Sequence, residues 1–413
     1  MKIGKFTTRD KCRLCDSKSL EMFLDLGFMP HAGNFLKKSE VGKELIYPLK
    51  LWFCKKCKLV QILDIIPSSV LFDDYRYLSS ISLTKHFEEF ADELVTKYLS
   101  KGNFAVEIGS NDGVLLVPLK NKGIKVLGVD PARNVARVAK NKGIEVVVDR
   151  FNDAVANKVL KKYGKADAVL ANNVLAHIDN MQEVFSGIKN ILNEYGVLIF
   201  EVHYLPDLLK KLQYDFFYNE HLSYYSLTAL VPFLSKFGLE IFNIKKISTH
   251  AGSVRVYAKF KNNKKYSPTR AVVNLLNAEK RSKLLRRTYL LKFSKAVSDH
   301  SKELNKYVVN LKESGYKIVG YGASGRANTL LNYCKIDDSV VEYIVDDSPE
   351  RQNRYTPGSH IYIVSPDYFR KDNAVKLSIL FAWNYRDQIL KKENLYIKNG
   401  GKFIVPLPKI TTT

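Results

Sequence analysis

Four of the five cysteines form two pairs, and the spacing within each pair points to metal binding. Cys12 and Cys15 form the first pair, and Cys54 and Cys57 form the second. Two residues between thiolates let both reach one ion, and two such knuckles complete a tetrahedral zinc site without an open position. We therefore predict structural zinc, because a redox CxxC normally precedes a helix and occurs singly. Cys334 stands alone and is expected to be a core thiol.

A glycine-containing loop in the first half of the chain is suited to a nucleotide-like ligand. The apolar run 104–108 leads into Gly109–Gly113, and Asp130 closes the next apolar run. Glycines permit a tight turn with close backbone approach, and the carboxylate can accept two hydrogen bonds from a ribose diol. This spacing fits NAD or S-adenosylmethionine (SAM). The loop favours SAM, because Asn111 replaces the second glycine of GxGxxG and Glu107 suits a cationic ligand better than a pyrophosphate.

A second glycine motif lies in the last third of the chain. Gly320, Gly322 and Gly325 form a complete GxGxxG, and Asp346 closes the following strand-like run. Alone, this motif suggests NAD. Its physical basis is phosphate capture by backbone N–H groups at a helix N-terminus, which the diphosphate of a sugar nucleotide satisfies equally well. Asp346 could bind a ribose or face solvent, and the sequence leaves both open.

Alternating strands and helices must position these loops, and the apolar pattern predicts them. Strand-like runs in the middle of the chain occupy residues 104–108, 126–129, 146–148, 168–171 and 196–202. Helical stretches such as 135–142 and 181–192 lie between them, which indicates a parallel sheet covered by helices. We expect 241–247 and 254–260 to form an antiparallel pair at one sheet edge. Arg255, on this last strand, is expected to be a solvated charge.

The flanking regions differ in character. Residues 1–75 hold short strands around the cysteines and are too few for a large core, so the metal would supply folding energy. An amphipathic helix is predicted over 83–99. A polar break at 261–268 precedes a lysine-rich helical region over 270–313. A second alternating unit follows, with strands predicted at 316–320, 341–345, 361–364, 377–382 and 403–405.

Composition sets broader limits. A length of 413 residues favours two or three domains, and 46% hydrophobic residues are enough for packed cores. The 65 basic and 42 acidic residues leave a net charge of +23, which attracts nucleic acid, anionic lipid or phosphorylated small molecules without choosing among them. Lysines are spread over the whole chain, which also fits a lysine-rich proteome. The polar first 20 residues and the lack of long apolar runs predict a cytoplasmic protein.

Several stretches in order make the chain similar to a known family. The stretches are Glu107–Gly113, Asn173–His177, Tyr218–Ser226, His250–Arg255, Gly320–Arg326 and Ala382–Tyr385, together with Tyr75–Ser80 and the four cysteines. They resemble the SAM-dependent C-methyltransferases that act on nucleotide-linked keto-deoxysugars, over essentially the whole chain. Ala251 departs from the family pattern. Asn219 stands where the family often has histidine, so we give position 219 no role in proton transfer.

The resemblance implies an α/β protein of three domains. A small zinc-binding domain would occupy residues 1–75, a central Rossmann-like SAM methyltransferase domain 76–265, and a second Rossmann-like domain that binds the nucleotide sugar 266–413. The first glycine loop would then hold SAM and the second the diphosphate. The two sites would face one another, so that the sugar reaches from the C-terminal domain into the methyltransferase cleft.

The same resemblance implies site residues. The catalytic group comprises His221, Glu220, Tyr218, His177 and Tyr77. The cofactor would be bound by Glu107, Gly109, Asn111, Asp112, Gly113, Asp130 and Asn173. The substrate would be bound by Gly322, Ser324, Gly325, Arg326 and Asp346.

Methyl transfer to carbon needs a carbanion equivalent. A ketone supplies one once a base removes the proton from the adjacent carbon, and histidine fits this task. His221 is the first candidate for the base, Glu220 would orient His221 or a substrate hydroxyl, and the tyrosines would carry or donate protons.

The predicted partner is a TDP-, GDP- or CDP-linked keto sugar, with C3 beside a 4-keto group as the expected methylation position. Nucleic acid and membranes are not expected partners, and the three-domain build is compatible with a monomer. Two other functions remain open at this point. One is a nicotinamide-dependent sugar-nucleotide oxidoreductase that uses the second glycine loop. The other is a nucleic-acid binder, although basic residues are not concentrated beside the cysteines.

Overall fold

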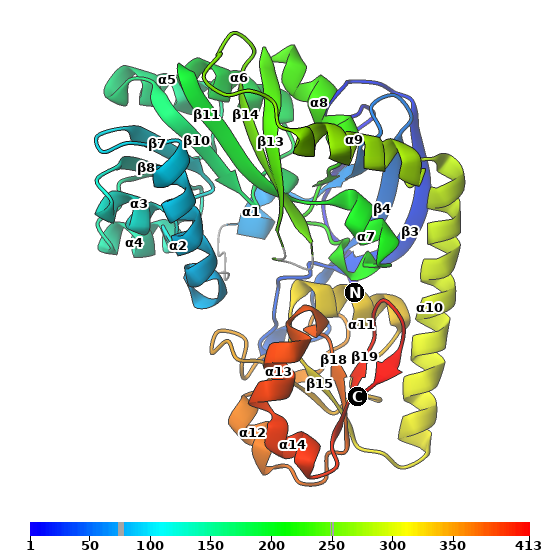
Figure 1. Cartoon of the computed structure of the whole chain (residues 1–413). Helices are drawn as coiled ribbons and strands as arrows, with labels where there is room; N and C mark the ends of the chain where they lie inside the picture. Colours follow the sequence, from blue (N-terminus) through cyan, green and yellow to red (C-terminus); the bar gives the residue numbers. More distant parts are fainter. Residues whose placement is uncertain (73–77, 248, 250–251) are drawn as a thin grey trace.

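The computed structural model describes residues 1–72, 78–247, 249 and 252–413 (Figure 1). Tyr77, His250 and Ala251 lie outside the described residues. The helices are α1 (Ser68–Phe72), α2 (Ser80–Lys97), α3 (Leu116–Asn121), α4 (Arg133–Asn141), α5 (Asp153–Tyr163), α6 (Met181–Ile191), α7 (Leu205–Lys210), α8 (Leu227–Lys236), α9 (Arg270–Ser282), α10 (Arg287–Glu313), α11 (Gly325–Cys334), α12 (Pro366–Lys371), α13 (Arg386–Lys392) and α14 (Asn394–Lys398). Short 3-10 turns are η1 (Lys38–Glu40), η2 (Leu175–His177), η3 (Tyr214–Phe216) and η5 (Trp383–Tyr385). Among the described residues, no helix is both long enough and apolar enough to cross a membrane.

The strands build three main sheets and one small pair. They are β1 (Lys2–Ile3), β2 (Thr7–Thr8), β3 (Leu20–Pro30), β4 (Leu45–Cys54), β5 (Val60–Ile62), β6 (Asp64–Ile65), β7 (Phe104–Ile108), β8 (Lys125–Val129), β9 (Val146–Val147), β10 (Ala166–Asn172), β11 (Leu192–His203), β12 (Ser223–Tyr224), β13 (Leu239–Ile247), β14 (Ser253–Phe260), β15 (Ile318–Tyr321), β16 (Tyr343–Val345), β17 (Tyr362–Val364), β18 (Leu377–Leu380), β19 (Lys402–Val405) and β20 (Thr411–Thr412).

The central sheet has the order β13-β14-β11-β10-β7-β8-β9. Strands β7 to β11 pair in parallel, and β13 and β14 form the expected antiparallel pair at one edge. Alternate residues of β7 serve opposite faces: Val106 packs in the core beneath α6 and α8, whereas Ala105 packs beneath α2 and α3. The chain order reverses between β7 and β10, and ligands of open α/β sheets bind at the carboxyl ends beside such a point.

The C-terminal sheet repeats this plan on a smaller scale, with the order β17-β16-β15-β18-β19-β20. Its first five strands are parallel and β20 is antiparallel. The predicted helical region before it, residues 270–313, consists of the two helices α9 and α10. The chain breaks after α9 because Lys283 adopts a left-handed backbone with φ +57°. Helix α10 then runs along one side of the molecule and packs against both β3 and α11 (Figure 1).

The N-terminal sheet does not stand alone. Its order is β1-β4-β5-β12, with β3 paired to β4, and β12 comes from the central part of the chain. Ser223 of β12 pairs with Gln61 of β5. Leu49 and Leu51 share a buried cluster with helix α10 and the C-terminal strands, whereas Leu59 packs in the core of the central sheet. The small metal-binding region therefore shares its core with both larger parts, which relieves its lack of apolar residues.

Candidate active site

The four paired cysteines meet at one point. Their Sγ atoms all lie within 4.8 Å of one another, with 3.4 Å between Cys12 and Cys57 and 3.5 Å between Cys15 and Cys54. A zinc ion with Zn–S bonds of about 2.3 Å needs sulfurs roughly 3.8 Å apart at the corners of a tetrahedron. No disulfide joins these residues. The arrangement fits one structural zinc ion, held with no place left for water.

The zinc knuckle is tied to the chain beside the predicted catalytic residues. Arg13, between the first two cysteines, has a fully buried guanidinium that donates to the backbone oxygens of Ile62 and Leu222. Its Nε also donates to Asp179 at 3.1 Å. Burial lowers the pKa of Arg13 to about 10, although the Asp179 carboxylate opposes this shift. The knuckle therefore holds Leu222, which directly follows His221, and Asp179, two residues after His177.

The first glycine loop is shaped around the end of β7. Gly109 has φ +67°, and a Cβ there would lie 2.5 Å from the side chain of Val174. The Asp130 carboxylate accepts hydrogen bonds from the backbone N–H groups of Asn111 at 2.8 Å and Ala132 at 2.9 Å. Burial raises the pKa of Asp130 above its ordinary value. On the outer side of the loop, Lys142 donates to the Asp112 carboxylate at 3.2 Å.

Buried hydrogen-bond acceptors gather beside this loop. Asn172 donates to Oε1 of Glu107 at 2.9 Å. Within the described residues, Oε2 of Glu107 and the side-chain oxygens of Asn172 and Asn173 are buried without a hydrogen-bond partner. Burial raises the pKa of Glu107 to about 8, and the charges of Asp130, among others, add to the shift. Buried acceptors without donors fit a ligand that brings N–H groups and positive charge, as SAM does with its ammonium and sulfonium.

Three histidine rings gather near the carboxyl ends of β10 and β11. The centroid of His221 lies 4.9 Å from that of His177 and 4.7 Å from that of His203. The hydroxyl of Tyr218 and Nε2 of His221 are 3.0 Å apart. Burial lowers the pKa of His177, although the charge of Glu220 opposes the shift. His203 ends β11, and no sequence motif had singled it out.

Backbone pairing holds the predicted catalytic loop, residues 218–226, in place. The N–H of Leu222 donates to the carbonyl of Ala176 at 2.7 Å, which ties the neighbours of His221 and His177 together. Asn219 donates from its side chain to the carbonyl of Pro48 in β4 at 3.1 Å. Asn219 thus connects the loop to β4.

Glu220 has a partner that the sequence did not suggest. It was expected to orient His221 or a substrate hydroxyl, but its Oε1 lies 2.7 Å from Nε2 of His31, directly after β3. Burial would raise the pKa of Glu220, yet the charge of His31 and the hydrogen bond between them outweigh burial and hold the pKa below its ordinary value. His31 lies outside every recognised motif, so only spatial proximity identifies it.

The second glycine loop, residues 320–325, lies against the loop that carries Tyr218 and His221. Gly322 has φ +97°, and a Cβ there would lie 2.4 Å from that of Ala382. Ser324 caps α11 by accepting from the N–H of Ala327 at 3.3 Å. A Cβ at Gly325 would lie 4.0 Å from the ring of Tyr218. The start of α11 therefore adjoins the catalytic loop.

Two predicted substrate residues already have protein partners. The Arg326 guanidinium donates to Asp215 at 2.9 and 2.6 Å and lies between the rings of Phe216 and Trp383. Trp383 donates to the same carboxylate at 3.0 Å. Asp346 is buried rather than facing solvent, and Arg351 lies 3.3 Å from it. Arg326 thus joins the C-terminal domain to the segment before the catalytic loop.

Arg255 was wrongly expected to be a solvated charge. Only 2% of the residue is exposed, and its Nε donates to Glu201 at 2.7 Å. His86 of α2 lies 3.1 Å from both oxygens of the same carboxylate. Burial would raise the pKa of Glu201, but the hydrogen bond from His86 and the charge of Arg255 outweigh it and lower the pKa. This buried network fastens α2 to the central sheet.

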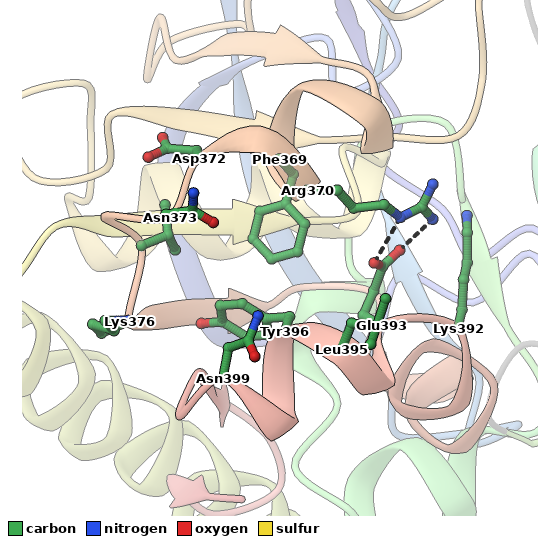
Figure 2. Close-up of a pocket in the computed structure, with 11 residues that line it drawn as sticks. Phe369, Arg370, Asp372, Asn373, Lys376, Lys392, Glu393, Leu395, Tyr396 and Asn399 are labelled. Carbon is green, nitrogen blue, oxygen red and sulfur yellow. Dashed lines mark hydrogen bonds and ion pairs between the residues drawn. The ribbon is translucent and has the colours of Figure 1, made fainter.

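A separate hollow of about 400 Å³ lies on the C-terminal domain between α12 and α14 (Figure 2). Phe369 and Tyr396 line it, and Arg370 binds Glu393 with both ends of its guanidinium at 3.0 and 2.8 Å (Figure 2). Helices α12 and α14 lead into the amino ends of β18 and β19, whereas the glycine loop follows the carboxyl end of β15. The hollow is therefore at the opposite edge of this sheet from the glycine loop.

Three family profiles match the chain in succession. Residues 12–72 match a zinc binding domain, residues 83–244 a methyltransferase domain, and residues 248–408 a C-methyltransferase C-terminal domain. Among characterised proteins, the chain is 32% identical over 404 residues to the C-methyltransferase NovU of Streptomyces niveus. That match covers 97% of this chain and 96% of the relative.

Solved structures overlap with less than half of the chain. The magnesium protoporphyrin IX methyltransferase of Synechocystis PCC 6803, with bound SAM, is 16% identical and has a TM-score of 0.34; the overlap covers 44% of this chain and 81% of that one. A SAM-dependent methyltransferase of Clostridium acetobutylicum has 17% identity and the same TM-score, covering 43% of this chain and 92% of that one. Likenesses of this size carry no part of the argument.

Proposed function

This chain belongs to the SAM-dependent C-methyltransferase family, and from that premise we propose that it methylates a nucleotide-linked 4-keto-deoxysugar, at a carbon beside the ketone that we expect to be C3. The three-part α/β architecture, SAM and structural zinc expected from the sequence are confirmed. The sugar, its position of methylation and the roles of the site residues are the proposed part.

One observation carries the sugar-nucleotide proposal. Gly325, at the start of α11, adjoins the ring of Tyr218, whose hydroxyl contacts His221. A helix N-terminus that follows a glycine loop can bind a diphosphate through its backbone N–H groups. A ligand held there by its diphosphate would place the attached sugar beside the histidine cluster. Asn173, which carries one of the buried acceptors beside the first glycine loop, is only four residues from His177 of the same cluster.

The residues suggest how the reaction proceeds. SAM, when bound, supplies a methyl group on a positively charged sulfur, and demethylated SAM is the product. The unit of His221 and Tyr218 would remove the proton from the carbon beside the ketone, which leaves an enolate that attacks the methyl carbon. His177 and His203 line the same space and would favour negative charge on the enolate oxygen. The removed proton stays on the His221–Tyr218 unit until it is released to solvent.

The comparisons argue against the other candidate function, a nicotinamide-dependent oxidoreductase. Its main support was the second glycine motif, but residues 248–408, which contain that motif, match the C-terminal domain of C-methyltransferases. The motif is therefore better explained as a sugar-nucleotide site than as an NAD site. TDP-, GDP- and CDP-linked sugars all carry the diphosphate that this proposal needs.

Mass spectrometry with a panel of TDP-, GDP- and CDP-linked 4-keto-6-deoxysugars tests the proposed function. We expect one donor-dependent product that is heavier by a methyl group, with the label on carbon. Calorimetry should show binding of demethylated SAM and none of NAD. Turnover of no sugar in the panel, or binding of NAD, would contradict the proposal.

His221→Asn tests the assigned base. We expect kcat to fall by about two to four orders of magnitude, since general base catalysis contributes roughly that factor. Binding of SAM should be unchanged, because Glu107 and Gly109, which we propose bind SAM, lie on other segments. His360→Asn is a suitable control, since His360 pairs with Glu44 away from the histidine cluster. Normal turnover by His221→Asn would remove this residue from the mechanism.

A further inference from the structure

A turn from the zinc-binding part of the chain enters the histidine cluster. His31 and Glu220 are 2.7 Å apart, and their side chains are only 12% and 11% exposed. The backbone of Gly33 also bonds to the Glu220 carboxylate. A Cβ at Gly33 would lie 2.9 Å from Oε1 of Glu220, so a side chain there would displace the carboxylate.

The same turn touches the C-terminal part of the chain. Asn328 of α11 donates from its side chain to the carbonyl of Ala32 at 2.5 Å. A Cβ at Gly325 would lie 3.6 Å from that of Ala32. Residues 31–33 therefore lie where all three parts of the molecule meet, between the catalytic loop and the glycine loop proposed to hold the diphosphate.

We propose that His31 is a positioning residue of the methyltransferase site, which holds the Glu220 carboxylate beside the histidine cluster so that Glu220 can orient the sugar. The proposal rests on the proposed function for the identity of the substrate. It makes the zinc-binding domain a contributor of a side chain to the site, in addition to its structural role.

Charge supports this assignment. An ionised carboxylate only accepts hydrogen bonds, and a sugar hydroxyl supplies a donor. Burial acts against ionisation of Glu220, and the pairing with His31 is the first influence that restores it. Without His31, the pKa of Glu220 should rise. The carboxyl would then be protonated over more of the pH range, and its orientation would no longer be fixed.

Other charged groups face Glu220 and its neighbours. His177 acts on Glu220 through its charge, from the turn after β10. His221 and Tyr218 belong to the same loop as Glu220, and His203 of β11 contacts His221. From the C-terminal part, α11 brings Arg326, which is paired with Asp215 rather than with Glu220.

His31→Asn, His31→Gln and a matched control separate a positioning role from a structural one. His360 pairs with Glu44 across the boundary of the N- and C-terminal parts, as His31 does with Glu220, but away from the histidine cluster. His360→Asn should therefore change stability without changing the pH profile of kcat/KM. His31→Asn should lower kcat/KM about tenfold to a hundredfold, as small misplacements in active sites do.

The pH profile distinguishes charge from hydrogen bonding. In His31→Asn the acidic limb should move to higher pH, because Glu220 loses the partner that lowers its pKa. Glutamine can place an N–H near the position of Nε2, so His31→Gln should regain part of the rate while the acidic limb stays displaced. Equal rates and equal profiles in wild type, His31→Asn and His360→Asn would overturn the proposal. Binding of SAM by each variant reports that it is folded.

A measurement without the sugar keeps this test apart from the proposed function. Nitrogen-15 spectra of the histidines in the full chain, of which there are eight, should show the His31 ring changing in Glu220→Gln and not in Glu44→Gln. Unchanged His31 signals in Glu220→Gln would overturn the pairing even if no sugar substrate is found. Failure of the whole sugar panel with changed His31 signals would instead count against the substrate.

Discussion

At the scale of single residues, Glu107 shows how the chain prepares for a cationic cofactor. Its carboxyl is buried, receives one hydrogen bond from Asn172 and has one oxygen without a partner among the described residues. Burial raises its pKa to about 8, so near neutral pH the group holds a proton much of the time in the free protein. A bound cation favours the ionised form, so SAM binding and proton release should be coupled.

We therefore predict that SAM binds more tightly as pH rises towards about 8 and that binding releases protons below this pH. Calorimetry in buffers with different ionisation enthalpies measures the number released. Glu107→Gln should remove the proton release and weaken SAM binding roughly tenfold to a hundredfold, the usual loss for a charge-assisted hydrogen bond.

The stability of the free protein should fall with rising pH, whereas its affinity for SAM should rise. Because the folded pKa of Glu107 lies above its unfolded value, the free protein loses stability as pH rises from about 4.5 to 8. Glu107→Gln should therefore be more stable than wild type at alkaline pH and not at acidic pH. Glu194→Gln, an exposed change on β11, should alter neither property. Proton release that persists in Glu107→Gln would assign the titration to another group.

At the scale of elements, the contact between η3 and α11 joins the C-terminal part to the catalytic loop. Arg326 of α11 binds Asp215 of η3, and the ring of Phe216 lies between this ion pair and the ring of His203, at 4.2 and 4.7 Å. The contact is buried on both sides, since the side chains of Arg326 and Asp215 are 10% and 2% exposed. A shift of α11 would therefore be transmitted to the rings around His221.

Asp215→Asn should destabilise the protein by about 3–5 kcal/mol, because removing one partner leaves a buried charge poorly compensated. Thermal denaturation measures this loss, and the KM for the sugar nucleotide should rise because α11 is less firmly placed. Asp367→Asn breaks a pair with Arg370 in which the Asp367 side chain is 81% exposed, and it should change stability by at most about 0.5 kcal/mol. Similar small effects from both variants would show that the buried contact does not hold α11.

At the scale of the whole molecule, the zinc site supports parts of the structure that are distant from it in sequence. The strand that completes the N-terminal sheet, β12, directly follows His221 and Leu222. Arg13, in the zinc knuckle, contacts the carbonyl of Leu222 and the carboxylate of Asp179. Structural zinc contributes roughly 10–16 kcal/mol to small domains, which is comparable with the whole net stability of about 5–15 kcal/mol.

Removal of zinc should therefore abolish methyl transfer before it abolishes SAM binding. Cys57→Ser and treatment with a chelator should reduce zinc content, measured by elemental analysis, and should lower the melting temperature. SAM binding should be affected less, because the residues proposed to bind SAM lie at the ends of β7, β8 and β10. Cys334→Ser is the matched control, since this thiol is buried beside Tyr214 and away from the metal site. Full turnover by metal-free protein would contradict a supporting role for zinc.

Much of this protein could be read from local sequence. The two CxxC pairs, the glycine loop after β7 and the GxGxxG before α11 each depend on short-range geometry, so spacing alone locates them. The strand and helix alternation is also local, and the antiparallel pair β13–β14 lies where the pattern predicted it. The roles assigned to individual site residues and the domain limits at 75 and 265 remain predictions.

The remaining features depend on contacts between residues far apart in the chain. His31 and Glu220 are separated by 189 positions, and Asp215 and Arg326 by 111 positions. Arg255 is charged, and no local pattern indicates that Glu201 and His86 would bury it. Burial of a charge depends on which partner the folded chain brings near, and pairing of that kind carries no periodicity along the sequence. The pairing of β12 with β5, which joins the metal site to the catalytic loop, came from the three-dimensional arrangement for the same reason.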